Sequence, residues 1–303
     1  MATVTADGPR RAATPAAAAE CIDLLAALRR FATIVAALLL AGCGERAAQP
    51  ENAAAAAPPP LQFAQESPDP LRHGERIARV LGCRGCHGDD MTGHEWVEDP
   101  DEAVLFTSNL RRAVPLYSDA ALERAIRGGV RLDGSPLWAM PSELFTDLSA
   151  PDMAALIRYL RAQPPTGEMH PRPVFGPSGR REIASGEWKS APDEVRLGRG
   201  RGPAAVPGGH DWARYMIRAT CSECHGLDLR GRQEAEGPRG PPDLAVVAGY
   251  SRDQFRHLMR TGLPPGGRDL GLMARVSRGR FAFLTQPEVD AIYDYLVARA
   301  ASP

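Results

Sequence analysis

The 303-residue chain has few aromatic residues, few cysteines and little net charge. Phe, Trp and Tyr make up 6% of the residues, against 28 prolines and 30 glycines. This balance favours small helical units joined by long loops over one large core. The net charge of −1 gives no indication of the basic domain that nucleic-acid binding calls for. With six cysteines, four of them in two short motifs, the chain also lacks a disulfide framework.

The chain also lacks a hydrophobic run long enough to span a membrane. Its longest apolar run, Phe31–Ala41, would form a helix of only ~16 Å, at ~1.5 Å per residue, against ~30 Å of hydrocarbon. Arg29 and Arg30 precede this run. A positive segment followed by a short apolar one predicts a secretory signal.

The residues after this run indicate how the mature protein begins. Leu40-Ala41-Gly42-Cys43 resembles a bacterial lipobox, in which Cys43 is lipidated and becomes the first mature residue. An ordinary signal peptide with an incidental cysteine is the alternative. We therefore expect a signal peptide with a lipobox over 1–43, a flexible tether over 44–65 and a periplasmic protein held at a membrane surface by its lipid anchor.

An internal repeat predicts the architecture. The motif Cys83–His87 (CRGCH) recurs at Cys221–His225 (CSECH). Tyr117 and Tyr250 each open a similar stretch in which a methionine follows 23 residues later. The repeat predicts an all-α fold of two tandem modules, 66–163 and 210–303, joined by a Pro/Gly/Arg-rich linker over 164–209.

Both copies end in the same helical pattern. Ser149-x-x-Asp152 and Thr285-x-x-Glu288 are expected capping boxes, in which hydroxyl and acid satisfy the opening N–H groups. An apolar stripe at helical spacing follows each box. We also expect helices over Leu71–Gly82 and Ser118–Arg127, and a last helix of the first module over Ser149–Arg161.

The C-x-x-C-H spacing predicts covalent haem. Cys83 and Cys86, or Cys221 and Cys224, can add their sulfurs to the two vinyl groups of one haem, and the next histidine then ligates the iron. A zinc site would need a second ligand pair nearby, and a redox dithiol would sit in a βαβ setting. We expect two haem c groups, with His87 and His225 as proximal ligands.

Two methionines are the expected sixth ligands of the irons. Met140 and Met273 both lie in segments expected to be loops between the second and last helices of their modules. A thioether opposite histidine raises the reduction potential. The alternative ligands are Met91 and His94 in the first module and His257 and Met259 in the second.

With these motifs, each module resembles a class I cytochrome c, and the whole resembles dihaem cytochrome subunits of bacterial periplasmic dehydrogenases and oxidases. The resemblance implies that a glycine before the haem motif crosses an aromatic residue on the last helix. Gly74 and Tyr159 match this in the first module, whereas Trp212-Ala213 replaces the glycine opposite Tyr295 in the second.

The family also implies a carbonyl that orients the histidine ligand. Pro242-Asp243-Leu244 matches the family's Pro-x-Leu element, whose proline carbonyl accepts from the histidine. The first module has Thr107-Ser108-Asn109-Leu110 at this place. This departure and the missing glycine leave the ligand geometry open.

The expected function is electron transfer rather than catalysis, because an iron with two protein ligands has no open position. Expected partners are a dehydrogenase and a terminal oxidase or another cytochrome, with no nucleic acid. The alternatives are a dihaem peroxidase or sulfur-compound oxidoreductase, and a haem subunit that only anchors a dehydrogenase. Residues 66–163 carry 16 acids and 11 arginines, and 210–303 carry 11 acids and 13 arginines. Either these opposite charges steer different partners to the two modules, or the acidic loops, with Glu95, Glu98, Asp99, Asp101 and Glu102 clustered, only keep the protein soluble.

Overall fold

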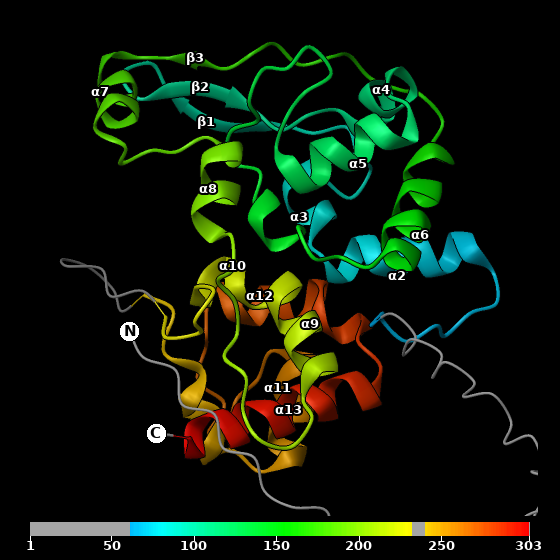
Figure 1. Cartoon of the computed structure of the whole chain (residues 1–303), viewed down its shortest axis with the longest axis vertical. Coiled ribbons are helices and arrows are strands. Elements are labelled where there is room, and N and C mark those ends of the chain that lie inside the picture. Colours follow the sequence, from blue (N-terminus) through cyan, green and yellow to red (C-terminus); the bar gives the residue numbers. More distant parts are fainter. Residues whose placement is uncertain (1–60, 232–239, 303) are drawn as a thin grey trace, which may run out of the picture. The chain divides into compact units, whose positions relative to one another are not determined.

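The computed structural model describes residues 61–231 and 240–302 (Figure 1). All of them belong to one folded unit, Pro59–Pro303. The expected signal peptide, with Cys43 and its lipobox, lies outside the described residues. No helix among the residues that the structure describes is long and apolar enough to cross a membrane.

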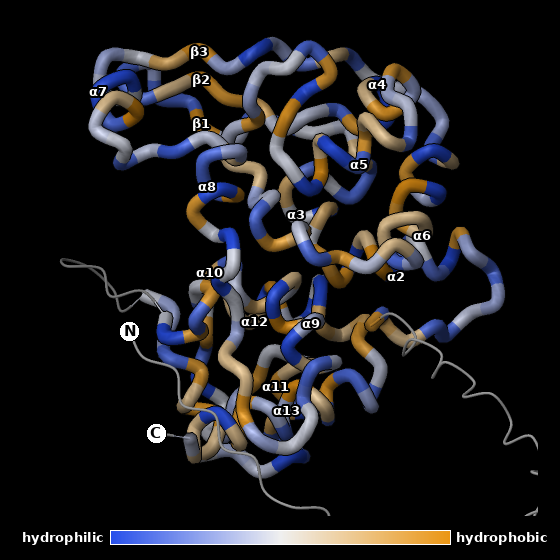
Figure 2. The backbone as a smooth tube through the Cα atoms, viewed as in Figure 1, coloured by the Kyte–Doolittle hydropathy of each residue, from blue (hydrophilic) through white to orange (hydrophobic). Residues whose placement is uncertain are grey.

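Helices make up most of the regular structure. In the first half they are α2 (Pro70–Val80), α3 (Cys83–His87), α4 (Leu110–Ala113), η1 (Val114–Leu116), α5 (Asp119–Gly128), η2 (Ser142–Leu144) and α6 (Ala150–Arg161). Then follow α7 (Pro177–Ser185), α8 (Ala191–Gly198), α9 (Asp211–Thr220), α10 (Ser222–His225), η3 (Leu244–Gly249), α11 (Arg252–Thr261), α12 (Leu272–Gly279), η4 (Phe281–Phe283) and α13 (Gln286–Ala301). Figure 2 shows apolar and polar residues alternating along α6 and α8, as amphipathic helices require.

The expected all-α fold needs a correction, because the structure contains a small antiparallel sheet. Strands β1 (Glu95–Asp99) and β2 (Ala103–Phe106) form a hairpin, and β3 (Val174–Phe175) pairs with the other edge of β2 (Figure 1). Side chains of β2 are alternately buried and half-buried, the period of a strand. The fold is therefore mostly helical, with one three-stranded sheet.

In the first half, α2 crosses α6 in close contact. A Cβ on Gly74 would lie 2.1 Å from the Ala155 carbonyl oxygen and 2.8 Å from Tyr159 Cβ. This is the crossing of glycine and aromatic residue expected from the resemblance. Only a residue without a side chain lets the two backbones come so close.

In the second half, α9 packs against α13 without such a glycine. Ala213 is buried instead, and the fully buried Tyr295 donates its hydroxyl to the Ala204 carbonyl oxygen at 3.0 Å. The apolar faces of both helix pairs belong to one hydrophobic cluster, which includes Ile77, Leu156, Ile217 and Ile292. The two halves therefore share a continuous core.

The two expected capping boxes have different outcomes. Thr285 and Glu288 form both reciprocal hydrogen bonds at the start of α13. At the start of α6 the Ser149 hydroxyl accepts from Asp152 N, but the Asp152 carboxylate accepts from Phe63 N and the Tyr215 hydroxyl instead of closing the box. The Asp152 carboxylate thus binds donors that are distant in the sequence rather than the N–H group at the start of its own helix.

Two expected connecting segments contain ordered structure. The expected tether, 44–65, overlaps the folded unit at its end, because Phe63 is fully buried in the core. The 164–209 linker contains β3, α7 and α8. It is held by contacts with the first half, such as Asn109 Nδ2 donating to the Thr166 carbonyl and a cluster of Trp138, Phe175 and Trp188.

Candidate functional site: the two C-x-x-C-H segments

Both C-x-x-C-H segments are single helical turns at the end of a longer amphipathic helix. Gly82, in the left-handed conformation with φ +83°, separates α2 from the Cys83–His87 turn. In the second half, Cys221 ends α9 and begins the turn of α10. Each histidine is thus held one helical turn beyond the first cysteine of its motif.

The four cysteines of the two motifs form no disulfide, and the environment of three of them does not favour thiolates. Burial raises the pKa of Cys83 to about 12 and also raises the pKa values of Cys86 and Cys221. A reactive dithiol or a zinc ligand needs a lowered pKa. Among the described residues, no group of three or more His, Cys, Asp or Glu side chains converges on a metal ion. The chemistry of these donors fits attachment to a porphyrin edge better than zinc.

The two histidine rings are oriented in the same way. His87 Nδ1 lies 2.8 Å from the Ser108 carbonyl oxygen, and His225 Nδ1 lies 2.8 Å from the Pro242 carbonyl oxygen. Burial lowers the pKa of both imidazoles, so both are neutral near pH 7. With Nδ1 donating to the carbonyl, Nε2 is the nitrogen left to bind a metal, an arrangement typical of ligand histidines.

The Pro242 contact is the one implied by the family resemblance. Ser108 provides the same carbonyl in the first half, although no proline stands there. A backbone carbonyl can have this role whatever its side chain. The departure from the Pro-x-Leu pattern therefore does not change how His87 is held.

The loops after the two motifs repeat each other hydrogen bond for hydrogen bond. Gly93 N donates to the His87 carbonyl as Gly231 N does to that of His225, both at 2.8 Å. Met91 N donates to the Gly88 carbonyl, as Leu229 N does to that of Gly226. Leu110 N then donates to the Met91 carbonyl, as Leu244 N does to that of Leu229. Two stretches 138 residues apart thus adopt one structure.

This correspondence explains Met91, one of the alternative ligands. Met91 and Leu229 occupy equivalent places, both fully buried and both with positive φ, 63° and 64°. Since leucine cannot ligate a metal, the shared role is packing. The structure therefore favours Met91 as a core residue.

The two expected sixth ligands are half-buried against the core. Met140 lies in a loop directly after Ala139, which has φ +59°, a strained value for a residue with a side chain. Met273 is not in the expected loop but is the second residue of α12, after Gly271 with φ +56°. Ligation by either thioether stays a prediction.

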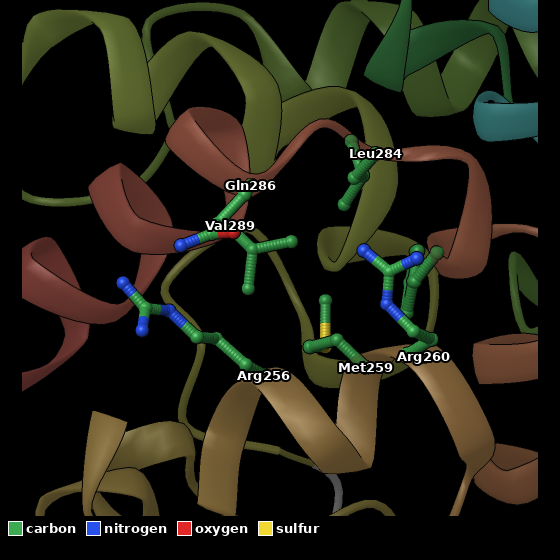
Figure 3. A pocket seen from close by; sticks show the side chains of 7 residues that line it. Arg256, Met259, Arg260, Leu284, Gln286 and Val289 are labelled. Atoms are coloured by element: carbon green, nitrogen blue, oxygen red, sulfur yellow. The ribbon is translucent and has the colours of Figure 1, made fainter. Parts of the chain in front are cut away.

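The remaining alternatives lie elsewhere. His94 and His257 are exposed, His94 next to Trp96 with 6.0 Å between ring centroids and His257 on α11. Met259 reaches into a hollow between α11 and the start of α13 (Figure 3). The lining residues are Arg256, Met259, Arg260, Phe281, Leu284, Gln286 and Val289.

Comparison with known proteins agrees with this geometry. The chain is 24% identical over 266 residues to the cytochrome c subunit of alcohol dehydrogenase (quinone) from Gluconacetobacter polyoxogenes and from Komagataeibacter europaeus, covering 75% of this chain and 55% of each relative. Two relatives of this chain are thus cytochrome c subunits of a dehydrogenase.

A further relative is a nicotinate dehydrogenase subunit from Pseudomonas putida, 27% identical over 258 residues. That alignment covers 77% of this chain and 22% of the relative. The chain therefore spans about half of the alcohol dehydrogenase subunits and about a fifth of the nicotinate dehydrogenase subunit. No family model matches the chain.

The acidic residues expected to steer a partner lie on the sheet. They occupy β1 and the turn that follows it, and are Glu95, Glu98, Asp99, Asp101 and Glu102. Four of the five are exposed and Glu102 is half-buried, and Trp96 is exposed among them. The hairpin begins two residues after Gly93, which is hydrogen-bonded to His87, so Glu95 is the acid nearest in the chain to the first C-x-x-C-H segment. The other end of the hairpin contacts the start of α7, where Ser178 N donates to the Asp101 carbonyl at 2.9 Å.

Proposed function

We propose that this chain is an electron-transfer subunit carrying two covalent haem c groups, one in each of two class I cytochrome c modules, 66–163 and 210–303. The observation that carries the proposal is the match between the two C-x-x-C-H segments. Each has two buried or half-buried thiols and a histidine whose Nδ1 faces a backbone carbonyl at 2.8 Å. Haem c supplies a one-electron iron couple at such a site.

Each part of a segment has its own role in holding the cofactor. Cys83 and Cys86, like Cys221 and Cys224, form thioethers to the porphyrin. The imidazoles of His87 and His225 bind the iron through Nε2. The carbonyls of Ser108 and Pro242 accept the Nδ1 protons, which fixes the ring planes and makes the imidazoles stronger donors.

On the distal side, Met140 and Met273 complete the coordination. An iron with both positions filled exchanges electrons with little rearrangement and binds no substrate. The chain is then a carrier and not an enzyme. Both methionines are half-buried against the core, and each lies between the second and last helices of its half.

The partners follow from the relatives and from the sequence. A dehydrogenase is the electron donor, in keeping with relatives that are dehydrogenase subunits, and a respiratory oxidase or another cytochrome is the acceptor. The expected secretory signal assigns this exchange to the periplasm. Lipidation of Cys43 keeps the protein at the membrane surface. The acidic hairpin of the first half offers a basic partner a steering field, an effect that salt screens.

Counting haems on the full chain tests the proposal. After export to a bacterial periplasm, the denatured polypeptide should retain two haem masses in acidified organic solvent. The double variants Cys83→Ala/Cys86→Ala and Cys221→Ala/Cys224→Ala should each retain one. A colourless wild-type chain, or one that loses its pigment to the solvent, would overturn the proposal.

Ligand binding separates the carrier from the alternative enzyme. The oxidised form of a carrier with two His/Met irons should bind cyanide only slowly at both sites. Fast cyanide binding to one haem of the protein as purified would instead indicate an open iron, as in a dihaem peroxidase or a sulfur-compound oxidoreductase.

A further inference from the structure

The two halves meet through two reciprocal contacts. Helix α2 of the first half contacts η4, the short helix before α13, and α9 of the second half contacts η2, the short helix before α6. Arg76 on α2 donates to the Phe283 carbonyl at 3.0 Å, and Arg218 on α9 donates to the Glu143 carbonyl at 3.0 Å. Because each C-x-x-C-H segment follows α2 or α9, both segments are carried to this interface.

Arg280 joins the two segments directly. Its guanidinium donates to the carbonyl oxygens of Val80 at 3.3 Å and Leu81 at 3.1 Å, the last residues before Gly82 and Cys83. The same group forms an ion pair of 2.6 Å with Glu223, which stands between Cys221 and Cys224. One side chain thus contacts the residues that flank or separate the cysteines of both motifs.

The setting of Arg280 shows that it is fixed there. Its side chain is 13% exposed, and its guanidinium lies 5.8 Å from the centre of the Phe281 ring. A Cβ on Gly82 would lie 2.4 Å from Arg280 Cζ, so the glycine leaves the space that the guanidinium fills.

We propose that Arg280 is a positioning residue common to both haem sites, which holds the two C-x-x-C-H segments side by side and raises the reduction potentials of both haems. The inference rests on the proposed function, since it requires two haems. The ferrous form of an iron carries one positive charge less than the ferric form, so a fixed cation stabilises it. In an interior of low dielectric constant this effect exceeds that of a surface charge.

Potentiometric titration of the full chain, followed by the absorbance of its haems, tests the inference. Arg280→Gln should shift both one-electron midpoints to lower potential. Arg280→Lys, which keeps the charge without the forked hydrogen bonds, should restore them toward the wild-type values. Glu223→Gln removes the opposing charge and should shift both midpoints upward.

Arg252→Gln is the matched control. Arg252 also pairs with an acid, Asp294, and also lies over an aromatic ring, that of Tyr293 at 4.8 Å, but it is on α11. This variant should leave both midpoints at their wild-type values. A shift as large as that of Arg280→Gln would show that any lost arginine lowers the potentials and would overturn the inference.

The outcomes also separate this inference from the proposed function. A wild-type chain with fewer than two covalent haems refutes the proposed function before any variant is titrated. If two haems are present and Arg280→Gln moves neither midpoint, or only one, Arg280 does not serve both sites. If the Arg280→Gln protein does not accumulate, Glu223→Gln provides the test instead. An upward shift of both midpoints supports the inference, and a shift of only one midpoint or of neither contradicts it.

Discussion

Arg76 and Glu288 are 212 residues apart in the sequence and form an ion pair in the interior, with 2.9 Å between Nη1 and Oε2. Arg76 lies on the first helix of the first half and Glu288 in the capping box of the last helix of the second half. Glu288 also accepts from Ala64 N at 2.7 Å. The pair therefore joins both halves and the segment that leads into α2.

We expect Glu288→Gln to destabilise the protein strongly. The substitution keeps the shape of the side chain but removes the buried counter-charge of Arg76, which costs about 3–5 kcal/mol. The remaining acid, Glu66, is 3.8 Å from Arg76 and mostly exposed, so it does not replace Glu288. Urea unfolding followed by circular dichroism measures this loss. Glu123→Gln is the control, because its pair with Arg127 is partly exposed and such pairs contribute about 0–1 kcal/mol. Equal midpoints for the two variants would contradict the expectation.

The carboxylate of Asp152 predicts a pH dependence of stability. Burial raises its pKa above the ordinary value of 3.8, although Tyr215 and Phe63 N donate to it and His73 lies 3.8 Å away. The folded state therefore holds this proton more tightly than the unfolded state. Protonated Asp152 therefore contributes its full stabilisation below pH 3.8, the pKa in the unfolded chain. This contribution is lost as the pH rises through the higher pKa of the folded state.

Asp152→Asn should remove this dependence while keeping an oxygen that accepts hydrogen bonds. The stability of the variant relative to wild type should thus improve from acidic pH to pH 7 in urea unfolding. Asp133→Asn provides a control of opposite sign, because hydrogen bonds from Ser135 lower the Asp133 pKa. A difference between Asp152→Asn and wild type that stays constant with pH would refute the assignment.

Gly74→Ala should separate α2 from α6. The added Cβ would meet the Ala155 backbone at 2.1 Å, and neither backbone can yield without moving its helix. Overpacking of this kind costs about 1–3 kcal/mol. Gly128→Ala is the control, since nothing lies within 4 Å of an added Cβ there. Thermal unfolding should show a lower midpoint for Gly74→Ala alone.

The methionine ligands can be assigned one at a time. Met140→Leu and Met273→Leu should each remove about half of the methionine-to-iron charge-transfer absorbance of the oxidised protein, because each haem has its own thioether ligand. Met91→Leu should keep the whole band, since Leu229 already fills the equivalent place in the other half. If the band decreases in Met91→Leu and not in Met140→Leu, Met91 is the ligand and Met140 is not.

The sequence by itself determined the elements whose causes are local. The C-x-x-C-H spacing, the N-cap residues Ser118, Ser149 and Thr285, and the apolar stripes of the last helices all act within one or two turns. Hydrogen bonds and packing at such short separation depend on residue type and spacing alone. For that reason the helices begin and end within a few residues of their expected positions.

The tertiary structure decided what depends on distant partners. Asp152 accepts hydrogen bonds from Tyr215 and Phe63 N instead of closing its capping box. The linker strand that contains Val174 pairs with β2. Arg280 contacts residues in or next to both C-x-x-C-H motifs, which are 138 residues apart. No spacing in the sequence encodes which of several arginines or acids meets another across the core. The pairing is fixed when the helices pack, because a buried charge or polar group without a partner costs free energy and a satisfied pair avoids that cost.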